Sequence, residues 1–339
     1  GALLLPNVAE VSPMELERPG KSYTADTLEQ LHKQIPGAEL WLLIGRDMFL
    51  TLDQWYHAAD VMAQAGICAF GRSVEDSQED FAPYLEFLEE SFPDAQVEII
   101  DVPGLVDISS TRLRELLAKG EGAEYLHPSV YGYILMNRLY GTHADLKHLD
   151  IPELRACSYS MVLEKRVRHI RGTEEEAVRL ARRWGADETM ARRAGILHDC
   201  TKYLELEEQL ELCEKYGVEL DELEHQAVKL LHSKTGACIA KHVFGEPEEV
   251  YQAIFWHTTA KADMTTLEKI LYVADYMEPN RTFEGVERLR ELAYRDLDAA
   301  LLLGVETTIQ EMKDRRRPVH TNTLQAQTWL KEHGVTVER

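Results

Sequence analysis

The apolar pattern of this chain changes near residue 150, and this change constrains the fold more than any other feature of the sequence. Up to about residue 140, short apolar runs of strand length alternate with stretches whose apolar residues recur at helical spacing. Beyond residues 151–152 the strand-like runs disappear, and nearly every segment up to residue 333 fits a helix. A chain of 339 residues also exceeds the size that one core fills comfortably. We therefore expect two domains, the first α/β and the second an all-α bundle.

The first part of the chain predicts a parallel sheet with crossover helices. Strands are expected at residues 2–5, 40–44, 67–70 and 97–102. Helices are expected at residues 25–34, 59–65, 81–91 and 111–118, and Gly120 is a stop signal after the last of them.

The second part predicts helices alone. They are expected at residues 159–169, 174–184, 187–197, 206–216, 225–244, 247–257, 266–276, 286–292 and 297–313. Acidic clusters at residues 174–176 and 246–249 are expected on solvated helix starts, where the helix dipole favours negative charge.

Charge and composition limit the partners. A formal net charge of -22 disfavours binding to duplex nucleic acid or to an anionic membrane, whereas small anions stay possible if a metal supplies local positive charge. The five cysteines are scattered and odd in number, which is typical of a reducing compartment. We therefore expect a cytoplasmic protein. No apolar run is long enough to span a bilayer, which predicts a soluble chain.

Several histidines and aspartates of the second part lie inside apolar helical segments. The His198-Asp199 pair alone is weak evidence for a metal site, because such a dipeptide also occurs as a simple helix-end cap. Ionisable groups that face a helical core are costly unless they are paired or bind metal, and groups on separate helices can converge only inside a bundle. The residues in such positions are His169, which is expected to end its helix, His198, Asp199, His232, His257 and Asp275.

Imidazole and carboxylate donors without thiolate indicate a hydrolytic site that holds iron, manganese, cobalt or zinc. Six ligands are too many for one catalytic ion, so we expect two ions that share Asp199 as a bridge. Asp199 and Lys202 are the expected catalytic residues, with Lys202 binding phosphate. The other histidines are expected to be structural or on the surface: His143, His148, His225, His242, His320 and His333.

The order of these motifs, together with residues 274–281, resembles the YqeK-type HD-domain dinucleoside tetraphosphate hydrolases over about residues 158–330. The resemblance implies a di-iron site and symmetrical hydrolysis of diadenosine tetraphosphate to two ADP. It implies that the six histidines and aspartates named above are the metal ligands. It also implies that Lys202 and Arg281 hold the phosphates.

The segment 107–114 places hydroxyl groups and basic residues at the start of a helix, where backbone N–H groups can hold phosphate. Taken alone it is better explained as a good N-cap. Together with residues 21–28 and 44–48, it resembles the NadD-type nicotinate-mononucleotide adenylyltransferases over about residues 1–140, a Rossmann-like nucleotidyltransferase fold. The resemblance implies contacts to ATP or to nicotinate mononucleotide from Thr24, Gly45, Asp47, Trp55, Ser109, Ser110, Thr111 and Arg114.

One departure from that family matters. The printed sequence lacks the family's first strand and its His-x-Gly-His motif, and residues 2–5 look like the family's second strand. We therefore expect this chain to be a poor adenylyltransferase, and we expect residues to be absent from it. The expected domains are residues 1–145, the incomplete nucleotidyltransferase domain, and residues 158–335, the HD-domain phosphohydrolase.

The sequence is compatible with three interpretations of the function. The first is a bifunctional enzyme, in which the HD half hydrolyses dinucleoside polyphosphates and the other half serves NAD biosynthesis. The second keeps the metal centre but assigns another nucleotide phosphoester. The third makes the N-terminal half a non-catalytic nucleotide-sensing module. A homodimer is possible in each of them.

Overall fold

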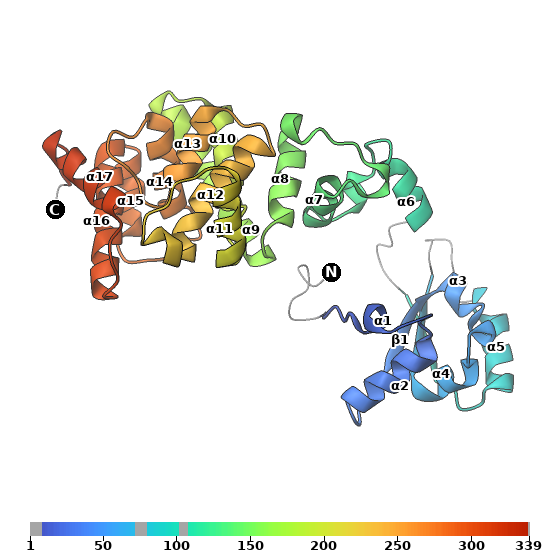
Figure 1. Ribbon diagram of the computed structural model, residues 1–339. Coiled ribbons are helices and arrows are strands. Elements are labelled where there is room, and N and C mark those ends of the chain that lie inside the picture. The colour runs from blue at the N-terminus through green and yellow to red at the C-terminus, as the bar shows by residue number, and fades with distance from the viewer. Residues whose placement is uncertain (1–8, 72–79, 102–107, 338–339) are drawn as a thin grey trace. The chain divides into compact units, whose positions relative to one another are not determined.

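The computed structural model describes residues 9–71, 80–101 and 108–337 (Figure 1). It contains two compact units, Gly1–Leu113 and Arg114–Arg339, and each is described here by itself. The division falls within α6 (Ser110–Leu117), earlier in the chain than the boundary expected near residue 150. The limits 1–145 and 158–335 stay predictions for the two domains.

The N-terminal unit contains a three-stranded parallel sheet, as the sequence predicts. Strands β1 (Trp41–Gly45), β2 (Gly66–Phe70) and β3 (Val97–Ile100) pair in that order. The middle strand has Ile67 and Ala69 wholly buried, as expected for a strand that is paired on both edges. The expected strand at residues 2–5 lies outside the described residues. The helices of this unit are α1 (Met14–Glu17), α2 (Thr24–Gln34), α3 (Arg46–Phe49), α4 (Ala58–Gln64) and α5 (Ala82–Ser91).

The C-terminal unit is helical throughout its described part, which confirms the expected all-α bundle. Its helices after α6 are α7 (Pro128–Met136), α8 (Ile151–Ser160), α9 (Glu164–Trp184), α10 (Glu188–Leu197), α11 (Leu206–Lys215), α12 (Val228–His242), α13 (Glu248–Trp256), α14 (Thr266–Met277), α15 (Val286–Ala293), α16 (Leu297–Asp314) and α17 (Thr321–Glu332).

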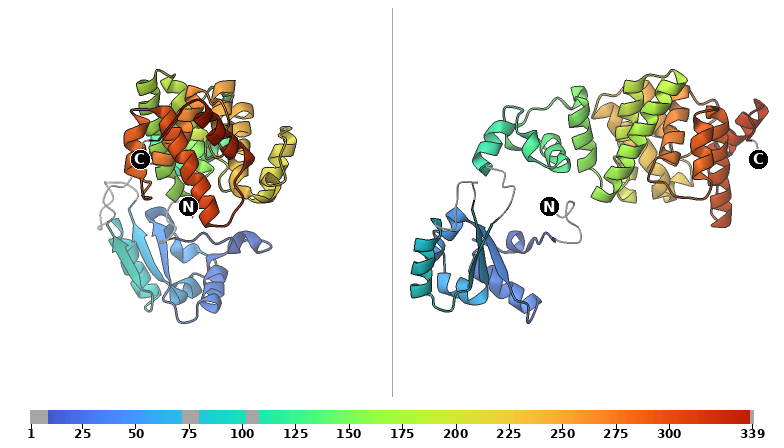
Figure 2. Two further views of the ribbon diagram at one scale, coloured as in Figure 1. Left: turned by 90° about the vertical axis from the view of Figure 1, so that its left-hand side faces the viewer. Right: turned by 180° about the vertical axis from the view of Figure 1, so that it is seen from behind.

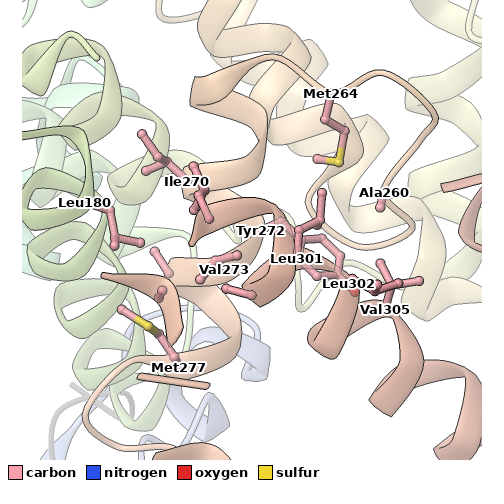
Figure 3. Packing of buried hydrophobic residues seen from close by; sticks show 14 of the residues in the cluster. Leu180, Ala260, Met264, Ile270, Tyr272, Val273, Met277, Leu301, Leu302 and Val305 are labelled. Carbon is pink, nitrogen blue, oxygen red and sulfur yellow. The ribbon is translucent and has the colours of Figure 1, made fainter. Parts of the chain in front are cut away.

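The main core of this unit forms around α14. Tyr272, Val273 and Met277 of α14 lie in one buried cluster with Leu301 and Val305 of α16 (Figure 3). Helix α16 in turn packs against α17, the last helix of the chain (Figure 2). In the part of the chain that is described, no helix is both long and apolar enough to cross a membrane.

The predicted helices 159–169 and 174–184 are wrong in their bounds. Helix α8 ends at Ser160, and one continuous helix, α9, then runs from Glu164 to Trp184. His169 therefore lies inside a helix and does not end one. The sequence suggested a break because His169 was expected to end one helix and the acidic residues 174–176 to start the next. The continuous helix tolerates Gly172 because the absent side chain leaves room for Glu278, as described below.

Only part of the acidic clusters lies on solvated helix starts. Residues 174–176 lie inside α9, whereas Glu248 and Glu249 are exposed in the first turn of α13, as expected. The side chain of Glu174 is 1% exposed and accepts hydrogen bonds from Arg155 and Arg192. Glu246 is equally buried and is bonded to Arg193. The sequence shows that these positions are acidic, but their arginine partners come from other parts of the chain. Both carboxylates thus join helices inside the bundle.

Three helices of this unit, α7, α8 and α17, were not among those expected. The segment up to Asp150 looks like a polar linker, yet Asp150 begins α8 with a capping box that it forms with Glu153. Helix α8 packs closely against α7, where Gly132 lies against the backbone of Ala156. A Cβ atom built on Gly132 would lie 1.9 Å from the carbonyl oxygen of Ala156.

This close approach predicts that Gly132→Ala destabilises the helical unit. The backbones of α7 and α8 must separate to admit the methyl group, so we expect a loss of about 1–3 kcal/mol in the free energy of unfolding. Urea denaturation followed by circular dichroism measures it. The matched control is Tyr133→Ala, because Tyr133 is the next residue of the same helix and is 56% exposed. Equal stability of the two variants would contradict the packing described here.

Candidate metal centre

The six residues expected as metal ligands come together in the helical unit. Each lies on a helix or directly after one, so the backbone fixes where its side chain points. His169 is in α9, His198 and Asp199 directly follow α10, His232 is in α12, His257 follows α13, and Asp275 is in α14.

Three of these residues form a first group. The Nε2 atom of His169 lies 3.2 Å from Nε2 of His198 and 2.9 Å from Oδ1 of Asp275. The side chain of His198 is wholly buried, and those of His169 and Asp275 are 7% and 16% exposed. Two imidazole nitrogens and one carboxylate oxygen thus face one small space, and these atoms could hold one metal ion.

The other three residues form a second group. His232 Nε2 and His257 Nε2 lie 3.2 Å apart, and Asp199 Oδ1 lies 3.1 Å from the first and 3.9 Å from the second. All three side chains are buried. This group could hold a second ion.

Asp199 connects the two groups because each of its oxygens faces a different one. Oδ1 belongs to the second group, while Oδ2 lies 3.6 Å from His169 Nε2 and 3.5 Å from His198 Nε2. Oδ1 is buried, and no hydrogen bond of acceptable geometry reaches it. An unsatisfied buried carboxylate oxygen is costly, and a metal ion would satisfy it. The residues present therefore fit two metal ions with Asp199 between them.

The four histidines are held with Nε2 directed inward, because Nδ1 of each is engaged. In three of them Nδ1 lies within 2.7 Å of the carbonyl oxygen three residues earlier in the chain, and in His169 it lies 3.1 Å from Oε1 of Glu278. A hydrogen bond from Nδ1–H fixes the tautomer that leaves a lone pair on Nε2. The three carbonyl partners belong to Gly195 for His198, Lys229 for His232 and Ile254 for His257.

Glu278 is a residue of this site that the sequence did not reveal. Its Oε1 accepts from His169, and its Oε2 accepts from the backbone N–H and the side-chain amide of Asn280. A Cβ atom on Gly172 would lie 2.4 Å from Oε2, so only glycine leaves this space open in α9. Glu278 lies within residues 274–281, but a glutamate next to a proline gives no signal of a buried partner.

The electrostatics of five of the six candidate ligands favour metal binding. Burial lowers the pKa of His198, His232 and His257 to about 4, so these imidazoles are neutral at pH 7. Burial would raise the pKa of Asp199 and Asp275, but the surrounding histidines, Lys202 and Arg281 hold both pKa values well below the usual range. Neutral imidazoles and ionised carboxylates are the forms that bind metal.

Three cationic side chains surround this centre. Lys202 Nζ lies 3.6 Å from Asp199 Oδ1, Arg281 donates to Asp275 Oδ1 at 2.7 Å, and Arg166 is paired with Asp199. Lys202 and Arg281 were expected here, whereas Arg166 was not. Both expected residues line a pocket of about 630 Å³ that reaches His232, His257 and Asp275, and Tyr276 and Phe283 form part of its wall.

A third cluster contains Asp221, Glu224 and His320, and it is structural. His320 was expected on the surface, but it is buried, with Nε2 3.2 Å from Glu224 Oε1. Its Nδ1 accepts from the backbone N–H of Asn322, so Nε2 carries the proton and donates to the carboxylates. Lys234 also binds Glu224, which completes a buried ion-paired link. A protonated Nε2 is not a metal ligand.

The candidate residues of the N-terminal half occupy turns and helix starts. Thr24 begins α2, Gly45 ends β1, and Asp47 lies in α3 directly after it. Trp55 packs against the core of the N-terminal unit.

The hydroxyl-rich segment near residue 110 behaves as a helix start. Ser109, Ser110 and Thr111 are exposed, and Ser109 Oγ accepts from the N–H of Arg112 as an N-cap does. Arg114 belongs to the other compact unit, where its guanidinium lies 5.2 Å from the centre of the Tyr140 ring. The nucleotide contacts of the eight N-terminal residues stay predictions.

Comparison with known proteins identifies the class of the helical unit. Residues 166–280 match the HD domain family, and this range contains all six candidate ligands. A crystal structure of a predicted HD superfamily hydrolase involved in NAD metabolism from Clostridium acetobutylicum is 39% identical, with a TM-score of 0.53, over 55% of this chain and 98% of that one. The fold and the site therefore define a metal-dependent phosphohydrolase of the HD class.

The family follows from curated relatives. Over 179 residues the chain is 36% identical to the symmetrical bis(5'-nucleosyl)-tetraphosphatase of Bacillus subtilis strain 168, covering 52% of this chain and 96% of that protein. The chain belongs to this family of HD hydrolases through its C-terminal half.

The N-terminal region is similar to a different family. A probable nicotinate-nucleotide adenylyltransferase of Lachnoclostridium phytofermentans is 37% identical over 131 residues, which cover 38% of this chain and 64% of that protein. The match thus spans less than two thirds of that relative.

The role given to Glu278 predicts that Glu278→Gln weakens metal binding. An amide has one acceptor oxygen, so it cannot accept from both His169 and Asn280 as the carboxylate does. We expect the affinity for Mn²⁺ at the group formed by His169, His198 and Asp275 to fall by about 10–100-fold. Calorimetric titration of the chelator-stripped protein measures it.

Glu287→Gln is the matched control, because the Glu287 side chain is 78% exposed. It should bind Mn²⁺ as the unchanged protein does. If Glu278→Gln also keeps the original affinity, Glu278 does not orient His169.

Proposed function

We propose that the helical unit hydrolyses diadenosine tetraphosphate symmetrically, giving two ADP. The observation that carries this proposal is the position of Asp199, whose two oxygens face two separate groups of donors. Two ions held about 3.5–4 Å apart form the usual clamp for displacement at phosphorus. We propose iron for both positions, with His169, His198 and Asp275 around one, His232 and His257 around the other, and Asp199 between them.

The substrate class is supported by the charges around the centre. The net charge of -22 repels anions over most of the surface, whereas Lys202, Lys229 and Arg281 line one pocket beside the candidate ligands. A polyphosphate is the kind of anion that such a local cation cluster binds. Tyr276 and Phe283, whose ring centres are 5.4 Å apart, give the same pocket an aromatic wall for a base.

The reaction needs only water as co-substrate. Water adds to one of the two inner phosphorus atoms, the central P–O–P bridge breaks, and the bridging oxygen leaves with the second ADP. When bound, the metal ions neutralise charge on the phosphoryl group and make a water molecule more acidic. Lys202 and Arg281 hold the phosphate chain, and their positions decide which phosphorus is presented. Because each half of the substrate is an ADP unit, cleavage at the centre gives a single nucleotide product.

For the N-terminal unit we propose nucleotide binding of the nicotinate-mononucleotide adenylyltransferase type. The similarity to the Lachnoclostridium protein supports it. Gly45 and Asp47 also follow the carboxyl end of β1, and ligands of open parallel sheets bind at the carboxyl ends of the strands. Titration with ATP and with nicotinate mononucleotide tests binding, and an assay for deamido-NAD tests turnover.

The central test is the product of early turnover with diadenosine tetraphosphate. We expect ADP alone by chromatography, and equal amounts of ATP and AMP would contradict the proposal. Lys202→Ala should lower turnover but keep the metal, since lysine serves phosphate. Asp199→Asn should lower turnover by about a thousandfold or more and also lose metal, since its bridging charge is removed. Metal analysis of the two variants separates these roles, and loss of metal from Lys202→Ala would contradict the role of Lys202.

A further inference from the structure

Arg166 is a buried partner of Asp199 that the proposed reaction has not yet used. It lies in the first turn of α9, three residues before His169, and its side chain is only 20% exposed. Its Nε donates to Asp199 Oδ2 at 2.5 Å, and its Nη2 is ion-paired with the same oxygen. One guanidinium therefore places two nitrogens against one carboxylate oxygen, and one of them donates a hydrogen bond to it.

That oxygen is also the one that faces the first group of donors. His169 Nε2 and His198 Nε2 lie 3.6 and 3.5 Å from Asp199 Oδ2. A carboxylate oxygen offers about two lone-pair directions. The hydrogen bond from Arg166 Nε occupies one of them, and the adjacent Nη2 crowds the other. An ion that binds Oδ2 must therefore displace at least one donor of Arg166. The arginine and the first metal ion compete for the same atom.

The displaced guanidinium has a natural second partner. Arg166 is paired with Asp199, and Lys202 Nζ lies 3.6 Å from Oδ1 of the same aspartate. Arg281 donates to Asp275 of the first group at 2.7 Å. The three cations thus gather at one centre, and a chain of four phosphates would neutralise them. An arginine also binds phosphate through the same paired N–H geometry with which it binds a carboxylate.

We propose that Arg166 exchanges partners during loading: it neutralises Asp199 in the metal-free protein and binds a substrate phosphate once metal occupies Asp199 Oδ2. The first half of this exchange rests on the site geometry alone, and the second half rests on the proposed function. The exchange makes metal bind before substrate, because Arg166 can bind phosphate only after the metal has displaced it from Asp199.

Arg166→Gln in the full chain tests the exchange without an activity measurement. After chelator treatment, the melting temperature of the variant should fall by about 5 °C or more, because a buried carboxylate loses its cation. Its affinity for Mn²⁺ should rise by about tenfold or more, because no competing cation remains at Oδ2. The affinity of the Mn²⁺-loaded variant for ADP should fall by about tenfold.

The matched control is Arg168→Gln, an exposed arginine of the same helix two residues away. It should leave the melting temperature and both affinities unchanged. If Arg166→Gln binds Mn²⁺ with equal or lower affinity than the unchanged protein, Arg166 does not compete with metal and the exchange is wrong. If ADP affinity stays the same, the phosphate half is wrong.

The metal titration also keeps this inference separate from the substrate assignment. Tighter Mn²⁺ binding by Arg166→Gln would support the competition even if diadenosine tetraphosphate were not cleaved. Symmetrical cleavage together with unchanged Mn²⁺ affinity would leave the proposed function intact and refute the exchange.

Discussion

The helical unit depends on the buried negative charge of Asp199. Its side chain is 1% exposed, and a carboxylate in such a place is stable only if cations or metal ions surround it. Four imidazoles, Lys202 and Arg166 do surround it, and they come from helices α9 and α12 and from the turns that follow α10 and α13. The separate helices must all be in place before this charge is satisfied, so the bundle and the site form together.

Local backbone chemistry then directs the ligands. Three histidines bond the carbonyl three residues earlier in their own helical turn, which needs no contact from elsewhere in the chain. His169 differs, because its partner Glu278 comes from beyond the end of α14 and enters through the space left by Gly172. The apolar face of α14 is fixed by Val273 and Met277 in the main core, while Asp275, between them in sequence, faces the site. Apolar packing on one face of α14 thus fixes the position of Asp275 on its other face.

The six candidate ligands could be picked out from the sequence because a charged or polar residue inside an apolar helical segment is unusual and costly. The structure brings these residues together, and their binding of metal stays a prediction. The same reasoning could not reveal Arg166 or Glu278, since arginine and glutamate in polar surroundings look like solvent-facing residues. The buried ion pairs of Glu174 and His320 could not be predicted either, because each depends on a partner that is distant in the sequence. The apolar pattern of the sequence identifies residues that would be costly to bury alone. The partners of those residues can be identified only from the folded structure.

Anomalous diffraction from crystals of the full chain equilibrated with Mn²⁺ tests most directly whether Asp199 serves two metal positions at once. Two anomalous peaks are expected, one beside His169, His198 and Asp275 and the other beside His232 and His257, with one oxygen of Asp199 on each. A single peak, or two peaks of which only one contacts Asp199, would contradict the central claim.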